Sequence, residues 1–143
     1  MAEDALAIYQ DVLDRTSEAL IAGDATVFLR HIHLPHRIIT ENGEFEVPDM
    51  TTALRHFNSF ASALSAQGVD SYVRSAKHAA FVEPGRILGR HVAHITSKGK
   101  LVTPAFENQM ELELRGGIWG ACFVRHHARF VAYPDILPRG GAE

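Results

Sequence analysis

Cysteine is nearly absent from this sequence, because Cys122 is the only one among 143 residues. A single cysteine excludes a disulfide within the chain and a zinc site built from several cysteines. This usage fits a reducing compartment, so we expect a cytoplasmic protein. Residues 1–20 carry acids where a signal peptide would carry a positive segment, so we expect no such peptide.

The sequence also lacks a basic excess and a long apolar run. Its formal net charge is −3, which does not favour nucleic acid or an anionic membrane as a partner. No apolar run approaches the roughly 18 residues that a membrane-spanning helix needs. We therefore expect neither a nucleic-acid nor a membrane partner. The length predicts one domain, residues 1–143, that ends in a loose tail, residues 134–143.

Hydrophobic residues, 46% of the chain, are arranged first in helical and then in strand patterns. Helical spacing predicts one helix over about residues 4–21 and a longer one over about 49–67. Between them, "AGD" ends the first helix and caps a short second one. A hairpin begins near His36 and turns at "ENGE".

After Gly68 the pattern predicts four strands, over residues 70–82, 86–97, 100–115 and 118–132. Short turn sequences separate them, which makes neighbouring strands antiparallel. Helices gathered before such a sheet indicate an α+β fold. A curved, mainly antiparallel sheet around the long helix would leave a conical cavity between the two.

This order of elements, with "AGD" after the first helix and "GGIWGACFV" as the final strand, resembles the nuclear transport factor 2-like superfamily. That superfamily includes the SnoaL-like cyclases and the ketosteroid isomerases. The resemblance covers roughly residues 4–132. It implies a cone-shaped α+β barrel in which N-terminal helices pack on the curved sheet. It also implies a homodimer that forms through the sheet.

The resemblance to ketosteroid isomerases can be carried over position by position from "AGD". The oxyanion-hole tyrosine position then holds Thr16, and the carboxylate base position holds Thr40. The second oxyanion position falls near Asn108. Threonine cannot abstract a proton from carbon at neutral pH, so steroid-isomerase chemistry is not expected. Whether the protein is an enzyme stays open at this point.

Two polar residues interrupt strand faces that are otherwise apolar, His91 on the second strand and Asn108 on the third. Each is either a core residue with its hydrogen bonds satisfied or a residue that meets a ligand. The short "SKGK" turn places the two side by side. We expect both to project into one cavity, whose predicted walls are Phe57, Phe60, Phe106 and Met110.

The stretch "RHIHLPHRI" holds three of the nine histidines, His31, His33 and His36. No acid is spaced to complete a metal site with them, so we expect neither a metal nor a cofactor. His31 is predicted to end the short helix, where the helix dipole favours it. His36 is predicted to open a strand at the cavity rim.

Two hypotheses for function remain, and both use the cone. In the first, the protein binds a small, mostly apolar or carbonyl-bearing ligand without chemistry. In the second, a lyase, isomerase or cyclase uses His91 as acid or base and Asn108 to orient a substrate oxygen, assisted by Thr16, Thr40 or His36. Either form would dimerise through the outer sheet face, predicted to present Arg90, Val92, His94, Thr103, Glu107, Gln109 and Glu111.

Overall fold

The computed structural model describes residues 4–128, and the predicted tail lies outside them. Three helices, α1 (Ala5–Ala22), α2 (Ala25–Arg30) and α3 (Met50–Ala66), match the predicted ones within about a residue. Asp4, Asp24 and Asp49 cap them by accepting hydrogen bonds from free backbone N–H groups. No helix of the described part combines the length and the apolar character needed to cross a membrane.

The described strands form one seven-stranded sheet in the order β2-β1-β7-β6-β4-β3, with the short β5 on β4. Their bounds are β1 Ile32–Thr40, β2 Gly43–Val47, β3 Ser71–Glu83, β4 Arg86–Ser97, β5 Lys100–Leu101, β6 Phe106–Arg115 and β7 Ile118–His127. All neighbours are antiparallel except β1 and β7, which are parallel. The protein is therefore an α+β fold, as predicted.

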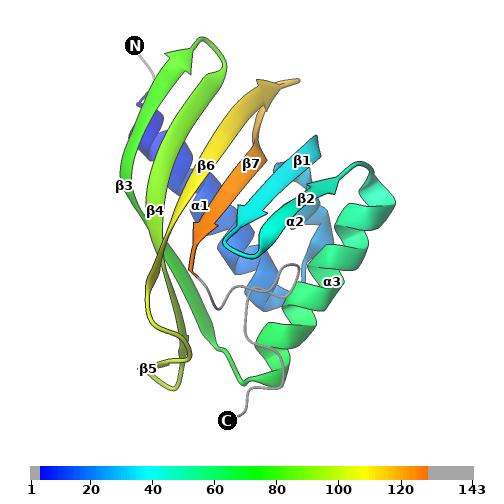
Figure 1. Ribbon diagram of the computed structural model, residues 1–143, viewed down its shortest axis with the longest axis vertical. Coiled ribbons are helices and arrows are strands. Elements are labelled where there is room, and N and C mark those ends of the chain that lie inside the picture. The colour runs from blue at the N-terminus through cyan, green and yellow to red at the C-terminus, as the bar shows by residue number, and fades with distance from the viewer. Residues whose placement is uncertain (1–3, 129–143) are drawn as a thin grey trace.

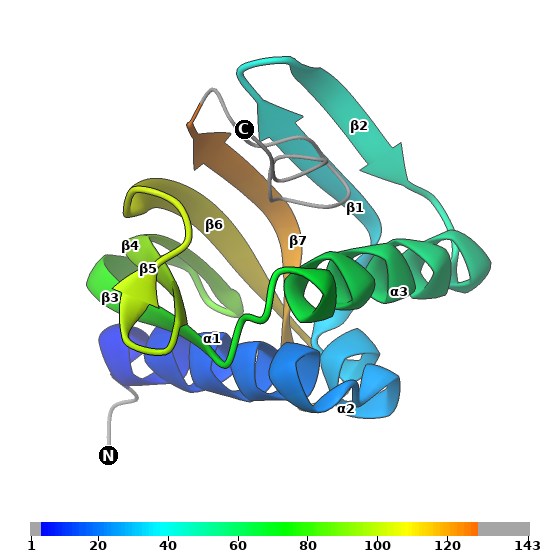
Figure 2. The same ribbon diagram turned by 90° about the horizontal axis from the view of Figure 1, so that it is seen from below.

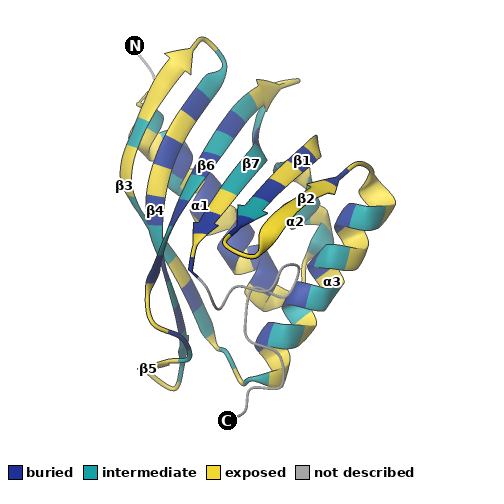
Figure 3. Cartoon of the chain, in the orientation of Figure 1, coloured by how far each residue is buried: buried dark blue, intermediate teal, exposed yellow. Residues whose placement is uncertain are grey.

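The sheet is strongly curved, and the helices lie on its concave side (Figures 1 and 2). Buried residues alternate with exposed or half-buried ones along β4, and with half-buried ones along most of β6 (Figure 3). The buried face of β4 carries Ile87, Gly89, His91, Ala93 and Ile95, which is the predicted apolar face with its histidine. The space that could hold a ligand therefore lies between this face and the helices.

Two strand predictions need correction. β1 begins at Ile32, ahead of Pro35, and its pairing with β7 shifts register between Ile32 and Arg37. The predicted strand over 100–115 is divided, because the chain leaves the sheet after Leu101 and rejoins it at Phe106. Thr103 lies in this interruption and is buried, so it does not belong to the outer sheet face.

The rest of the predicted outer face is ordered by ion pairs between strands. Arg90 on β4 contacts Glu107 on β6, with 2.7 Å between Nη1 and Oε2. Arg86 contacts Glu111 and Glu113 in the same way. Charged pairs across adjacent strands keep this face polar while the opposite face is buried.

Candidate functional site

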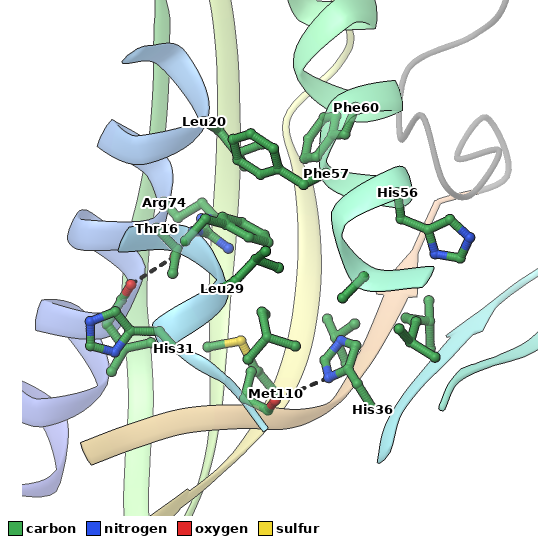
Figure 4. A pocket seen from close by; sticks show the side chains of 18 of the residues that line it. Thr16, Leu20, Leu29, His31, His36, His56, Phe57, Phe60, Arg74 and Met110 are labelled. Atoms are coloured by element: carbon green, nitrogen blue, oxygen red, sulfur yellow. Dashed lines mark hydrogen bonds between the residues drawn. The ribbon is translucent and has the colours of Figure 1, made fainter. Parts of the chain in front are cut away.

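A pocket of about 110 Å³ lies between α3 and the concave face of the sheet (Figure 4). Figure 4 shows Phe57 and Phe60 above it, with Thr16, Arg74 and His31 on one side and His36 and His56 on the other. None of the described residues that line it is Asp or Glu. The remaining walls are mostly apolar and include Val12, Leu20, Leu29, Ile38, Val47, Met110 and Val124.

Five of the residues predicted to meet a ligand line this pocket, and two do not. The five are Thr16, His36, Phe57, Phe60 and Met110. Phe106 is buried in the adjacent core against Ala93 and Ile95. The Thr40 hydroxyl accepts a hydrogen bond from the Asn42 N–H in the β1–β2 turn.

His91 and Asn108 are neighbours, as predicted, but they do not line the pocket. They face each other across β4 and β6, with 3.4 Å between His91 Nε2 and Asn108 Nδ2. His91 Nδ1 lies 2.7 Å from the hydroxyl oxygen of Tyr9. Each side chain is only 1% exposed. The prediction that both project into the cavity is therefore wrong, because Tyr9 of α1 contacts His91 and Asn108 is bonded between His91 and His126.

Tyr9 reaches this position because Gly89 leaves room for its ring. A Cβ at Gly89 would overlap the Tyr9 ring and would lie 2.8 Å from the carbonyl oxygen of His78. The parity of the strand identified His91 as an inward residue. It could not show that a tyrosine from the first helix would cover it.

The same polar contacts continue to His126, which does line the pocket. His126 lies opposite Asn108 on β7, with 2.8 Å between His126 Nδ1 and Asn108 Oδ1. Tyr9, His91, Asn108 and His126 thus form a buried polar chain from α1 to the pocket wall. We did not predict His126 from the sequence, although the β6–β7 register was the signal that could have found it.

Arg74 on β3 is the second pocket residue that the sequence analysis missed. Its Nε donates to Ser17 Oγ at 2.7 Å, and its Nη2 donates to the Leu13 carbonyl at 3.0 Å and to Thr16. The guanidinium also lies over the Tyr72 ring, 4.9 Å from its centroid. These contacts hold a positive charge at the pocket wall between α1 and β3.

The imidazoles of His36, His91 and His126 are neutral at physiological pH. Burial lowers the pKa of His36 to about 4, against the hydrogen bond that its ring makes to Ala121. Burial, with the Arg74 charge next, lowers the pKa of His126 to about 3. The same two causes hold the pKa of His91 well below its usual value. Burial also raises the pKa of Tyr9, so its phenol stays protonated.

Solved structures show what this arrangement resembles. An NTF2-like protein of unknown function from Shewanella oneidensis superimposes with a TM-score of 0.65 at 12% identity, over 85% of this chain and 98% of its own. A cystatin-like domain of unknown function from Nostoc punctiforme gives 0.68 at 12% identity, over 89% and 78%. An NTF2-like protein from Cytophaga hutchinsonii gives 0.61 at 12% identity, over 88% and 99%.

The protein has the NTF2-like fold. The sequence matches no protein-family model, and it matches no curated protein. At 12% sequence identity, structural similarity establishes the fold only. The function has to be inferred from the residues of the site. The NTF2-like fold of this chain carries neither a carboxylate nor a pocket-lining residue at the position that the isomerase resemblance assigns to the base, Thr40.

The three clustered histidines have a structural role in this NTF2-like sheet. His31 Nδ1 donates to the carbonyl of Trp119, His33 Nε2 to Ile118, and His36 Nδ1 to Ala121, at 2.8, 2.9 and 3.1 Å. They fall where β1 and β7 shift register, so side-chain donors take over from the interrupted backbone ladder.

Gly120 makes this arrangement possible, because a Cβ there would lie 2.8 Å from the His33 ring. His31 is the C-cap residue of α2, as predicted. His31 and His36 lie on opposite sides of the pocket (Figure 4). Within residues 4–128, no group of three potential ligands is placed to hold a metal ion.

Proposed function

We propose that this protein binds a small, mostly apolar molecule with one polar oxygen, carbonyl or hydroxyl, in the pocket between α3 and the sheet. The observation that carries the proposal is the composition of the pocket wall. Phe57, Phe60 and Met110 offer apolar surface, while two neutral imidazoles and Arg74 offer polar contacts. A mostly apolar concavity with a few polar groups is the usual form of a small-molecule site.

The size of the pocket sets the size of the ligand. Its volume of about 110 Å³ is somewhat below that of an engineered apolar cavity of about 150 Å³ that accepts benzene. The proposal is therefore for a single six-membered ring or a chain of similar bulk. A steroid skeleton would require the helices to move apart.

Two of the four histidines that line the pocket favour binding over catalysis. A general base works best when its pKa lies near the ambient pH. His36 and His126 have pKa values of about 4 and about 3, too low for this task. His91, the acid or base of the alternative hypothesis, contacts Tyr9 and Asn108 and does not line the pocket.

The test is thermal unfolding with a panel of cyclohexanone, benzaldehyde, phenol and toluene. A molecule that binds the native state raises the midpoint by mass action. Ala53→Leu adds bulk to the pocket wall and should abolish the rise. Ala66→Leu, at the exposed end of α3, is the matched control and should keep it. An equal rise in Ala53→Leu would place binding elsewhere, and no rise with any probe would refute the proposal.

We also propose that two copies of the chain associate through the outer face of the sheet. This face combines the Arg90–Glu107 pair with Val92 and with exposed Leu88, a mixture that suits a contact between identical surfaces. Light scattering at micromolar concentration should give about twice the 15.8 kDa of one chain. A mass equal to that of one chain would refute this proposal. The single cysteine accords with the cytoplasm as the proposed compartment.

A further inference from the structure

The two neutral imidazoles of the pocket carry their single proton on the nitrogen that faces the protein. His36 Nδ1 lies 3.1 Å from the Ala121 carbonyl, which can only accept, so the proton is on Nδ1. His126 Nδ1 lies 2.8 Å from Asn108 Oδ1, which also only accepts. The second nitrogen, Nε2, is therefore an unprotonated acceptor in both rings.

The buried polar chain fixes the tautomer of His126. With Oδ1 of Asn108 turned to His126, its Nδ2 donates toward His91 Nε2. His91 then carries its proton on Nδ1, where it donates to the Tyr9 oxygen. Each contact thus pairs one donor with one acceptor, from α1 to the pocket. The chain positions His126, and with the Asn108 amide in this orientation the proton of His126 is on Nδ1.

The outer nitrogens remain available to a ligand. Neither His36 Nε2 nor His126 Nε2 is hydrogen-bonded to a described residue, and the same holds for Nη1 of Arg74. No fully buried side-chain nitrogen or oxygen of the described part lacks a partner, so these three atoms are accessible from the pocket or from solvent. The Arg74 charge is close enough to His126 to lower its pKa.

We propose that the pocket recognises its ligand through a hydroxyl group on a small ring, which donates its proton to Nε2 of His126 and accepts a hydrogen bond from Arg74. This inference rests on the proposed function and narrows its ligand class. A hydroxyl is matched to both neighbours because it donates and accepts. A carbonyl could pair with Arg74 but would leave the lone pair of His126 without a donor, which is unfavourable in an apolar site.

The test compares phenol with toluene, which has nearly the same shape but no hydroxyl. Dissociation constants of the full chain are measured by NMR titration of backbone amides. Replacing the acceptor in His126→Phe should lower the phenol-to-toluene affinity ratio about tenfold, the equivalent of one hydrogen bond. His127→Phe, the exposed neighbour on the same strand, should leave the ratio unchanged.

A second measurement on the unaltered protein decides the matter even where His126→Phe does not fold. Long-range ¹H–¹⁵N spectra of the imidazoles should show His126 protonated at Nδ1 only, and phenol should shift its Nε2 resonance while toluene does not. A proton on Nε2 of His126 would overturn the inference. If phenol and toluene bind with the same ratio in both variants, the hydroxyl inference fails and the proposed function survives. If neither binds, the proposed function fails as well.

Discussion

The region between the helices and the concave face of the sheet has two halves. Both are built from apolar and aromatic residues, but one half is packed and the other contains the pocket. In the closed half, α1 packs mainly on β3 and also reaches β4, and Tyr9, Leu13, Ile87 and Leu112 belong to one buried apolar cluster. In the open half, α3 stands off from β1 and β7, and Phe57 and Phe60 face a pocket. Gly89 contributes to this difference, because the absence of a Cβ at this position lets the Tyr9 ring pack against β4.

Each half holds a buried histidine, and comparing them separates structure from function. His91 in the closed half has a protein partner at both ring nitrogens. His126 in the open half has a protein partner at one nitrogen, and its ring lines the pocket. A buried imidazole is therefore a candidate ligand contact when one of its ring nitrogens has no protein partner. Burial alone does not distinguish a structural histidine from a ligand-binding one.

Acidification should lower the unfolding free energy of the whole protein, and this is the largest effect we expect. An imidazole with a folded-state pKa below the unfolded value of 6.5 binds fewer protons in the native state. The unfolding free energy then falls as pH drops from 6.5 toward about 4 for His36 and about 3 for His126. Between pH 6.5 and pH 5 these two alone should lower the unfolding free energy by about 3 kcal/mol.

Guanidinium unfolding at pH 7.5, 6.5, 5.5 and 5 measures how the unfolding free energy changes with pH. An unfolding free energy that stays constant over this range would mean that the imidazoles are charged in the native state. The tautomer argument for His126 would then have no basis.

Gly89→Ala should damage the closed half and spare the pocket. The added methyl would overlap the Tyr9 ring and would press on the backbone carbonyl of His78, which cannot move aside cheaply. Overpacking of this kind costs about 1–3 kcal/mol. Chemical unfolding should show this loss, while Leu54→Ala, at an exposed position of α3, should change stability by less than about 0.5 kcal/mol. Equal losses in the two variants would contradict the role given to Gly89.

Tyr9→Phe should cost less, because only one hydrogen bond is removed. His91 Nδ1 would lose its partner in a buried site, which costs about 1–2 kcal/mol. The matched control is Tyr72→Phe, since Tyr72 is also buried and its hydroxyl makes no hydrogen bond to a described residue. A fluorescence-monitored unfolding curve for each variant gives the difference. Similar curves for both would show that the polar chain adds nothing to stability.

The sequence predicted the parts of this protein that depend on local patterns. The junction of α1 and α2 followed from the "AGD" signal at Gly23 and Asp24, and the pairing of His91 with Asn108 followed from the short turn between their strands. The assignment of the pocket residues depended on contacts between distant segments. Tyr9 is 82 positions from His91, and no periodicity in either element indicates that their side chains meet.

The three histidines of β1 illustrate the same limit. Their hydrogen bonds to the carbonyls of Ile118, Trp119 and Ala121 depend on the parallel pairing of β1 with β7, two strands that are far apart in the sequence. Thr103 was misplaced because strict alternation was continued through Pro104, where the chain leaves the sheet. Arg74 was missed because its strand showed no clear alternation, and only the fold brings it to Thr16.

Thr40→Val should produce the smallest effect, and it tests whether the position of the isomerase base has any connection with the pocket. The Thr40 hydroxyl accepts from the Asn42 N–H and donates to the Gly43 carbonyl in an exposed turn. Water can replace both partners, so the loss of stability should stay below about 1 kcal/mol. Probe affinity in the NMR titration should not change, because the side chain does not line the pocket.

Thr16→Val is the informative contrast, since Thr16 contacts Arg74 at the pocket wall and its replacement should alter the affinity for phenol. A response to Thr40→Val as large as that to Thr16→Val would mean that ligands reach the β1–β2 turn and that the pocket extends beyond its present walls.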